Sequence, residues 1–168
     1  MKTCPAIIAM FFFMLPALAH AEWITKTVDD NFSNAKKATM IATINAYDAD
    51  QIFLFDCTKE TLSFAYIEKS IDLGRATLPV DMVVKIDSDE SLAMKGVTGF
   101  RNDEFSQIMT DEREPILNML KEAGQARAKI SVGLSISELD VKQTYSADMA
   151  GAAKAIEEFS SACGLNLK

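Results

Sequence analysis

The 168-residue sequence predicts one α+β domain, a β-rich antiparallel sheet or small sandwich with two packed helices and one disulfide. Three observations favour this fold. Short segments in which apolar and polar residues alternate follow one another through most of the chain, as in strands that bury one face. Two later segments repeat apolar residues at helical spacing. Because strands and helices do not alternate regularly, the pattern disfavours a doubly wound parallel sheet.

The first segment, Met1–Ala21, has the pattern of a secretory signal peptide. Lys2 supplies the positive start, an apolar run follows from Ala6 to Leu15, and small residues end the segment. The run is short for a permanent membrane anchor. An uncleaved anchor is the alternative, and a lipoprotein is less favoured because Cys4 precedes the run. We therefore expect a periplasmic or secreted β-rich domain at residues 22–168, with no stable membrane span after cleavage.

Cleavage also changes the available chemistry, because His20, the only histidine, and Cys4 leave with the signal peptide. Cys57 and Cys163 remain. Two cysteines in an exported chain favour one disulfide. A redox pair is the alternative, but it usually has C-x-x-C spacing, which is absent. The prediction is a structural Cys57–Cys163 bond that ties an early strand to the end of the last helix.

The first half of the domain predicts an antiparallel meander. Alternation places strands at Trp23–Val28, Thr39–Ala46, Ile52–Cys57 and Thr61–Ile67, with turns at Asp29–Asn31, Tyr47–Asp50 and Lys59–Glu60. A longer connection, Glu68–Pro79, contains Gly74. We expect Trp23 to close one end of the core.

The middle of the chain predicts further short strands. In Val80–Asp87, alternate residues are apolar, so we expect Met82, Val84 and Ile86 to face inward and the charged residues between them to face water. Ser91–Met94 and Val97–Arg101 form a predicted hairpin around Lys95-Gly96, and Phe105–Met109 is one more short strand.

The last third predicts two helices separated by a strand pair. The first helix is Glu114–Gln125, with capping residues at Thr110–Glu112 and Pro115 in the first turn. Ala128–Ile136 and Leu139–Tyr145 form the predicted strand pair. The second helix, Ala147–Cys163, is expected to begin at a Ser146 cap and to stop at Gly164. The total is about eight strands and two helices.

Acidic clusters are the first candidates for a binding site. Asp87–Glu90 offers oxygen ligands at alternating positions, as Ca²⁺ prefers, but it lacks the glycine and glutamate of an EF-hand loop. A solvated turn is the favoured interpretation. The same reasoning applies to Asp29-Asp30, Asp103-Glu104 and Asp111-Glu112. We predict no metal ligands and no cofactor site.

Catalytic sets are not apparent, so the sequence predicts a protein that is not an enzyme. The mature chain lacks histidine and a G-x-S-x-G elbow. Ser131 and Ser135 lie near Lys129 without S-x-x-K spacing. A carboxylate pair for glycoside hydrolysis stays open. The aromatic residues of two neighbouring strands line either the core or a ligand groove: Phe53, Phe55, Phe64 and Tyr66.

A spaced set of features resembles a known group of proteins. It runs through Trp23, Asp29-Asp30, Phe53–Cys57, Val83–Asp87, Ile116–Leu120, Tyr145–Ile156 and Ala162–Gly164. This set resembles the VasI/TagO-like proteins associated with type VI secretion and, more distantly, the invasion-associated locus B proteins. The resemblance implies an exported bacterial protein with a small β-rich domain. Where that group often has a tryptophan-serine pair, this chain has Phe100-Arg101-Asn102. The resemblance brings no catalytic residues.

The leading functional prediction is a non-enzymatic exported accessory or binding protein, linked to a secretion system or the cell envelope. Its expected partner is an envelope protein or a cell-wall component. A net charge of −7 argues against nucleic acid, which requires a clustered positive surface. The same charge suits an alternative, an acidic inhibitor or immunity-type binder of a basic hydrolase. A cell-wall hydrolase is the other alternative.

Overall fold

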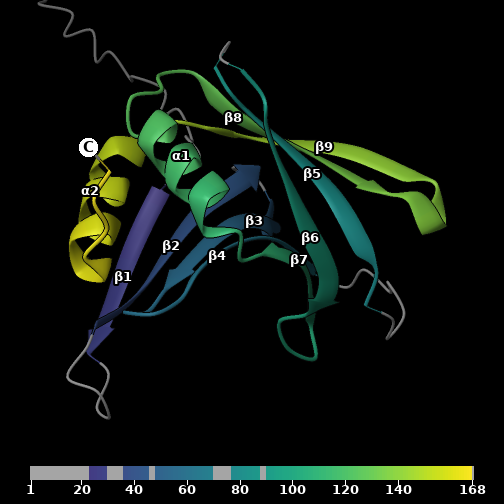
Figure 1. Cartoon of the computed structure of the whole chain (residues 1–168), viewed down its shortest axis with the longest axis horizontal. Helices are drawn as coiled ribbons and strands as arrows, with labels where there is room; N and C mark the ends of the chain where they lie inside the picture. Colours follow the sequence, from purple (N-terminus) through teal and green to yellow (C-terminus); the bar gives the residue numbers. More distant parts are fainter. Residues whose placement is uncertain (1–22, 30–35, 46–47, 70–76, 88–89, 168) are drawn as a thin grey trace, which may run out of the picture.

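The computed structural model of the chain describes residues 23–29, 36–45, 48–69, 77–87 and 90–167. The predicted signal peptide, Met1–Ala21, lies outside the described residues. Within them, nine strands form a single antiparallel sheet that curls into a half-barrel, with two helices on one side of it (Figure 1). The predicted α+β class is therefore confirmed, and of the two architectures left open the chain adopts the single sheet.

The sheet order shows how the chain builds the curl. From one edge to the other the strands are β1 (Trp23–Asp29), β2 (Lys36–Asn45), β3 (Asp48–Cys57), β4 (Leu62–Lys69), β7 (Phe105–Thr110), β6 (Leu92–Phe100), β5 (Pro79–Ile86), β8 (Lys129–Ile136) and β9 (Val141–Asp148). The predicted meander forms β1 to β4. A short 3₁₀ turn, Ser137–Leu139, joins β8 to β9.

The core fills the concave inner face of the sheet. Each strand contributes every second side chain to it, so β5 alternates strictly between exposed and buried residues. The helices α1 (Arg113–Ala123) and α2 (Ala152–Cys163) cover this face. Helix α1 packs against β4, β5 and β6, and α2 packs against β1 and β2. The sequence left open whether four aromatic residues line the core or a ligand groove. Of these, Phe53, Phe55 and Phe64 are fully buried in the core.

The predicted hairpin around Lys95-Gly96 is wrong, because β6 runs through it without a turn. Gly96 lies in the middle of the strand and is buried. A Cβ atom at this position would lie 2.7 Å from Met82 Sδ and 2.9 Å from the Met109 backbone oxygen. The glycine is therefore needed for close packing between β6 and its neighbours, and not for a turn.

The predicted start of the second helix is also wrong. Strand β9 continues to Asp148, and α2 begins only at Ala152. Ser146, the expected cap, is a strand residue whose hydroxyl lies 2.8 Å from that of Ser131 on β8. The chain turns at Gly151, whose φ of 80° lies in the left-handed region that glycine favours. The period of two therefore extends further along the chain than the helical pattern suggests.

Helix α1 begins and ends close to its predicted bounds, but its capping differs. Its N-cap residue is Glu112, which makes no side-chain capping bond. The Thr110 hydroxyl instead accepts a 3.3 Å hydrogen bond from the Glu112 backbone N–H.

Gly96→Ala is expected to lower the free energy of unfolding by about 1–3 kcal/mol, because the added methyl group overpacks the interior. The matched control is Gly99→Ala in the same strand, where the nearest atom, Gln107 Nε2, lies 3.9 Å from the added Cβ. This control is expected to be neutral or to stabilise by about 0.5 kcal/mol. Urea unfolding of both variants measures the difference. Equal effects of the two substitutions would contradict the packing role of Gly96.

Candidate functional site

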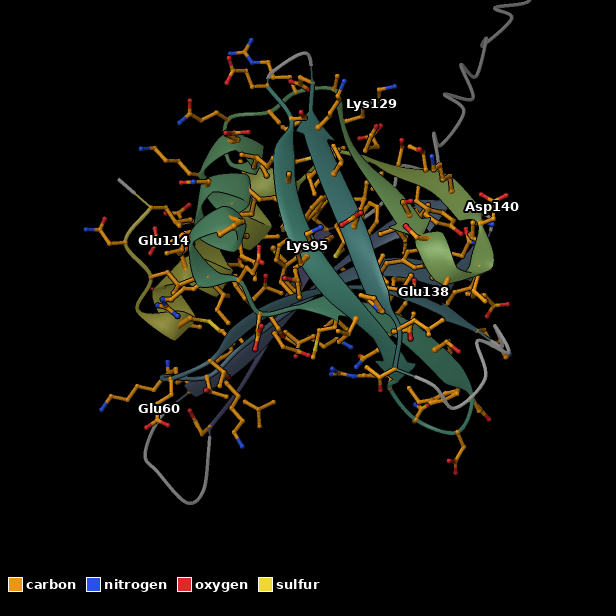
Figure 2. The ribbon with its side chains drawn as sticks, turned by 45° about the vertical axis from the view of Figure 1, so that its right-hand side comes forward. Glu60, Lys95, Glu114, Lys129, Glu138 and Asp140 are labelled. Carbon is orange, nitrogen blue, oxygen red and sulfur yellow. A yellow bond between two sulfur atoms is a disulfide. The ribbon has the colours of Figure 1, made fainter. Side chains whose placement is uncertain are left out.

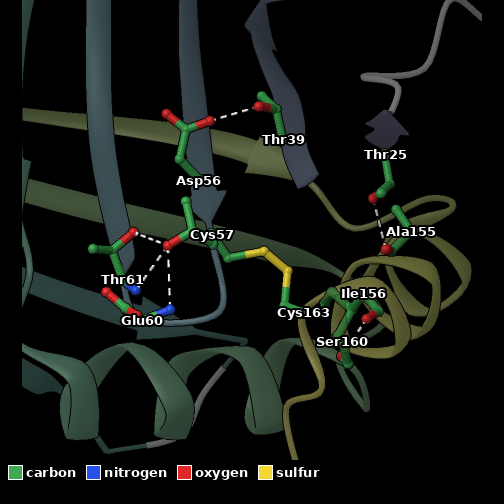
Figure 3. Close-up of a disulfide and its surroundings, with 11 residues drawn as sticks. Thr25, Thr39, Asp56, Cys57, Glu60, Thr61, Ala155, Ile156, Ser160 and Cys163 are labelled. Atoms are coloured by element: carbon green, nitrogen blue, oxygen red, sulfur yellow. Dashed lines mark hydrogen bonds between the residues drawn. A yellow bond between two sulfur atoms is a disulfide. The ribbon is translucent and has the colours of Figure 1, made fainter. Parts of the chain in front are cut away.

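The disulfide closes one end of the half-barrel. Cys57 ends β3 and Cys163 ends α2, and their Cα atoms lie 6.1 Å apart, within the usual range for a bridge (Figure 3). The bond joins an early strand to the last helix, as the sequence predicts. Beside it, the Thr58 hydroxyl accepts backbone hydrogen bonds from Glu60 and Thr61 in the β3–β4 turn. These hydrogen bonds fix the turn that directly follows Cys57, which is consistent with a structural role for the disulfide.

Trp23 connects the two edges of the sheet. Its indole Nε1 donates a 2.6 Å hydrogen bond to the backbone oxygen of Asp148, so β1 is linked directly to β9. The side chain is 5% exposed, and its ring centroid lies 6.2 Å from that of Phe55. Trp23 therefore occupies the predicted position at one end of the core and also holds the sheet in its curl.

A small cavity, which we call the two-tyrosine pocket, lies on the inner face between β4, β7, β8 and β9. Its volume is about 140 Å³. The residues that line it are mostly apolar: Tyr66, Ile108, Leu134, Ile136, Val141, Gln143 and Tyr145. The rings of Tyr66 and Tyr145 stack with centroids 4.1 Å apart, which brings β9 against β4 across the curl. Of the predicted aromatic residues, Tyr66 alone lines this pocket.

The hydroxyl groups of the two tyrosines that line the pocket are both hydrogen-bonded. The Tyr66 hydroxyl donates a 2.6 Å hydrogen bond to Glu68 Oε2, and Gln51 Nε2 donates a 2.9 Å bond to Glu68 Oε1. The Tyr145 hydroxyl donates to Gln143 Oε1. Burial, followed by the bond to Glu68, raises the pKa of Tyr66 far above its ordinary value. Burial also raises the pKa of Tyr145. Both hydroxyls therefore stay protonated.

A second feature, which we call the outer band, crosses the opposite face of the sheet. One residue from each of seven neighbouring strands stands in direct register with the next, and all seven are apolar: Ile24, Ile41, Leu54, Ala65, Met109, Val97 and Pro79. The middle of the band is buried among its own neighbours, while Ile24 and Val97 are 41% and 42% exposed. Most antiparallel sheets present polar side chains on the face away from the core.

Charged residues lie along both sides of the outer band. On one side, Lys95 forms an ion pair with Asp81. On the other, Lys69 Nζ lies 3.9 Å from Asp50 Oδ1. These pairs place polar groups on both rims of the apolar surface.

Arg101 reaches across the outer face of the sheet to form an ion pair. Its Nη1 lies 2.7 Å from Asp56 Oδ2, although Arg101 follows the end of β6, and β7 and β4 lie between β6 and β3, which carries Asp56. The arginine side chain therefore reaches across the outer face, and its aliphatic part can cover apolar neighbours. The Thr39 hydroxyl donates a 2.6 Å bond to Asp56 Oδ1, which holds this carboxylate in place (Figure 3).

The acidic candidate at Asp87 has a structural role. Its carboxylate accepts three backbone hydrogen bonds, each 2.9 Å long, from Arg127, Ala128 and Lys129. These bonds lower the pKa of the Asp87 carboxyl, with the bond from Arg127 as the largest cause. The carboxylate thus fastens the end of β5 to the start of β8. Ser88 and Asp89 lie outside the described residues.

The remaining sequence candidates do not come together as a reactive site. The Ser131 hydroxyl pairs with Ser146, and Asp103-Glu104 and Asp111 are exposed at turns. In the part of the chain that the structure describes, no group of three or more His, Cys, Asp or Glu side chains is placed to hold a metal ion. Over the same residues, no helix is long and apolar enough to cross a membrane. Asp30 of the Asp29-Asp30 pair lies outside these residues.

Sequence reasoning missed both the outer band and the two-tyrosine pocket. The sequence does contain one indication of the band. Ile52–Phe55 is apolar at four successive positions, and a strand with only one buried face would need apolar residues at two of them, so this strand has apolar residues on both faces. The pocket had no such signal, since its walls come from three separate parts of the sequence, namely β4, β7 and the β8–β9 hairpin.

Comparison with known proteins yields no relative: no family model, curated protein or solved structure matches the chain. The resemblance to VasI/TagO-like proteins therefore stays a prediction.

Replacing both cysteines, as Cys57→Ala with Cys163→Ala, is expected to lower the free energy of unfolding by a few kcal/mol. The bond closes a loop with a sequence separation of 106 residues, for which the chain-entropy model gives about 4.7 kcal/mol. Denaturant unfolding under non-reducing conditions measures the loss, and reduced wild-type protein is the control. Two free thiols in the native protein, counted by mass-shift labelling, would refute the bond.

Asp87→Asn is expected to destabilise the protein at neutral pH and to have less effect in acid. The folded pKa of Asp87 is below its ordinary value of 3.8. The charged form therefore stabilises the fold above that value, and this contribution is lost as the pH falls through the lower folded pKa. Urea unfolding at pH 7 and at about pH 2.5 measures both limits.

The matched control for Asp87 is Asp140→Asn. Both residues have a left-handed backbone, with φ of 49° and 51°, and asparagine tolerates this conformation. Asp140 is exposed, and no side-chain hydrogen bond of it is found within the described residues. Its substitution should change stability little at either pH. A pH-independent loss in Asp87→Asn would contradict the role of the charged carboxylate.

Proposed function

We propose that this protein is an exported, non-enzymatic binding protein that docks a protein of the cell envelope on its outer band. The observation that carries the proposal is the unbroken apolar register across seven strands on the face away from the core. The ends of the band are exposed at Ile24 and Val97, and exposed apolar surface with a polar rim is typical of protein interaction sites.

The partner's expected chemistry follows from the composition of the band. Aliphatic side chains and Met109 bury well against aliphatic or aromatic side chains of another protein. The rims carry both signs of charge, in the pairs Lys95–Asp81 and Lys69–Asp50, so they fix orientation rather than select one sign. A sugar polymer would instead require many exposed hydrogen-bonding groups at the centre of the surface.

Export is the other part of the proposal. The signal-peptide pattern of Met1–Ala21 supports it, and so does the Cys57–Cys163 bond, because disulfides persist in oxidising compartments. The resemblance to VasI/TagO-like proteins adds a finer proposal, an association with a secretion system.

Site-specific photo-crosslinking in cells that export the protein tests the docking surface. A photoreactive residue at Val97, in the band, is expected to give a discrete adduct with another protein. The matched control carries the same residue at Thr144, an exposed position on the outer face of β9 and outside the band. Ile24→Lys in the Val97 probe should cut the adduct at least tenfold, because it places a charge in the buried interface.

The outcome that would overturn docking on the band is also defined. It is either the same adduct from both probe positions or an adduct at Val97 that Ile24→Lys leaves unchanged. Ile24 is 41% exposed and lies on an edge strand, so its replacement is expected to preserve the fold. Unchanged thermal unfolding of the variant provides the control for folding.

A further inference from the structure

The two-tyrosine pocket lies on the inner face of the sheet, opposite the outer band, and it is independent of the function proposed above. It opens beside the β8–β9 hairpin, on the side of the molecule away from α1. Figure 2 shows the hairpin, labelled at Glu138 and Asp140, on the opposite side of the molecule from α1, which is labelled at Glu114. Neither the disulfide nor the Trp23 bond lines the pocket.

The size of the pocket limits its occupant to about one ring. Its volume of about 140 Å³ is close to that of engineered apolar cavities of about 150 Å³, which stay dry and bind benzene. A side chain or ligand with two fused rings exceeds this space.

The walls of the pocket favour an apolar molecule. Ile108, Leu134 and Ile136 come from β7 and β8 and are buried. They offer no hydrogen-bonding group, so a charged group placed against them would lose its hydration without compensation. The Glu68 carboxylate, which accepts the Tyr66 bond at one wall, further disfavours an anion.

The mouth of the pocket supplies a polar contact. Gln143 is exposed, and its amide oxygen accepts the Tyr145 hydroxyl, while its NH₂ group has two donors to offer. Val141 and Tyr145 are half-buried on the same strand. Among the described residues, β9 is an edge strand whose backbone pairs only with β8, so it is the wall that can shift to admit a ligand.

We infer that the two-tyrosine pocket is a binding site for a small, uncharged, single-ring molecule with one hydroxyl group. The ring of the ligand occupies the apolar space beside Tyr66 and Tyr145. The hydroxyl group of the ligand accepts a hydrogen bond from the Gln143 amide at the mouth of the pocket. Phenols and cyclic alcohols of this size are the ligand class.

Titration calorimetry with para-cresol and cyclohexanol tests the site on the intact oxidised protein. Both compounds are expected to bind with a 1:1 stoichiometry and to raise the thermal unfolding temperature by mass action. Para-hydroxybenzoate, a ring of similar size with a negative charge, should bind at least tenfold more weakly. An absence of heat and of stabilisation with both neutral probes at millimolar concentration would overturn the inference.

Two substitutions separate this pocket from any other binding position. Val141→Phe fills the cavity from a half-buried position and should weaken the binding of both probes at least tenfold. Thr144→Phe places the same ring on the opposite face of the same strand, and binding should stay within twofold of wild type. Equal affinities in the two variants would place binding elsewhere and overturn the assignment.

Gln143→Ala tests the polar contact at the mouth, since the exposed side chain can be removed without opening the core. The substitution should weaken the binding of para-cresol at least threefold. It should leave the affinity for toluene, which has no hydroxyl group, unchanged. An equal loss for both compounds would contradict the proposed hydrogen bond. Thermal unfolding of each variant without ligand shows whether the fold is retained.

Discussion

The curl of the sheet depends on the contact between its first and last strands. A nine-stranded sheet with one apolar face must bury that face, and two short helices are too small to cover it if it stays flat. Curling lets β9 approach the inner face of β2 and β4 instead. The hydrogen bond from Trp23 Nε1 to the Asp148 oxygen holds the two edges together at one end, and the Tyr66–Tyr145 stack holds β9 against β4 at the other.

The two ends of the half-barrel are closed by different means, and this difference creates the pocket. At one end, α2 is fixed by the Cys57–Cys163 bond and by the Thr25 hydroxyl, which donates a 2.7 Å bond to the Ala155 oxygen (Figure 3). Phe159 fills the space there, with its ring 6.3 Å from that of Phe55. Neither of the two helices in the described part of the chain covers the other end, where side chains of β4, β7, β8 and β9 line the pocket. The pocket is therefore a consequence of topology and not of a missing side chain.

Local periodicity predicts the fold class well because one face of each strand is buried. The strict alternation of β5 and β8 and the apolar stripe of α2 are visible in the sequence and correspond to buried residues. The wrong predictions concern residues whose type is required by contacts with strands that are distant in sequence. Gly96 suggests a turn, but its lack of a side chain instead leaves room for Met82 and Met109 on neighbouring strands. Ser146 suggests a cap, but pairing with β8 keeps it in a strand.

The candidate sites escape prediction for the same physical reason, since each is assembled by register between strands. In the outer band, Leu54 and Ala65 look like ordinary strand residues until pairing aligns them with Ile41 and Met109. Strand β4 is apolar on both faces, with Tyr66 inside and Ile67 outside, and both are at most 3% exposed. A strand that is buried on both faces has little freedom to adjust, so β4 is the rigid wall of both sites. Adaptation to a ligand must therefore come from edge strand β9, and adaptation to a partner from the exposed ends of the band at Ile24 and Val97.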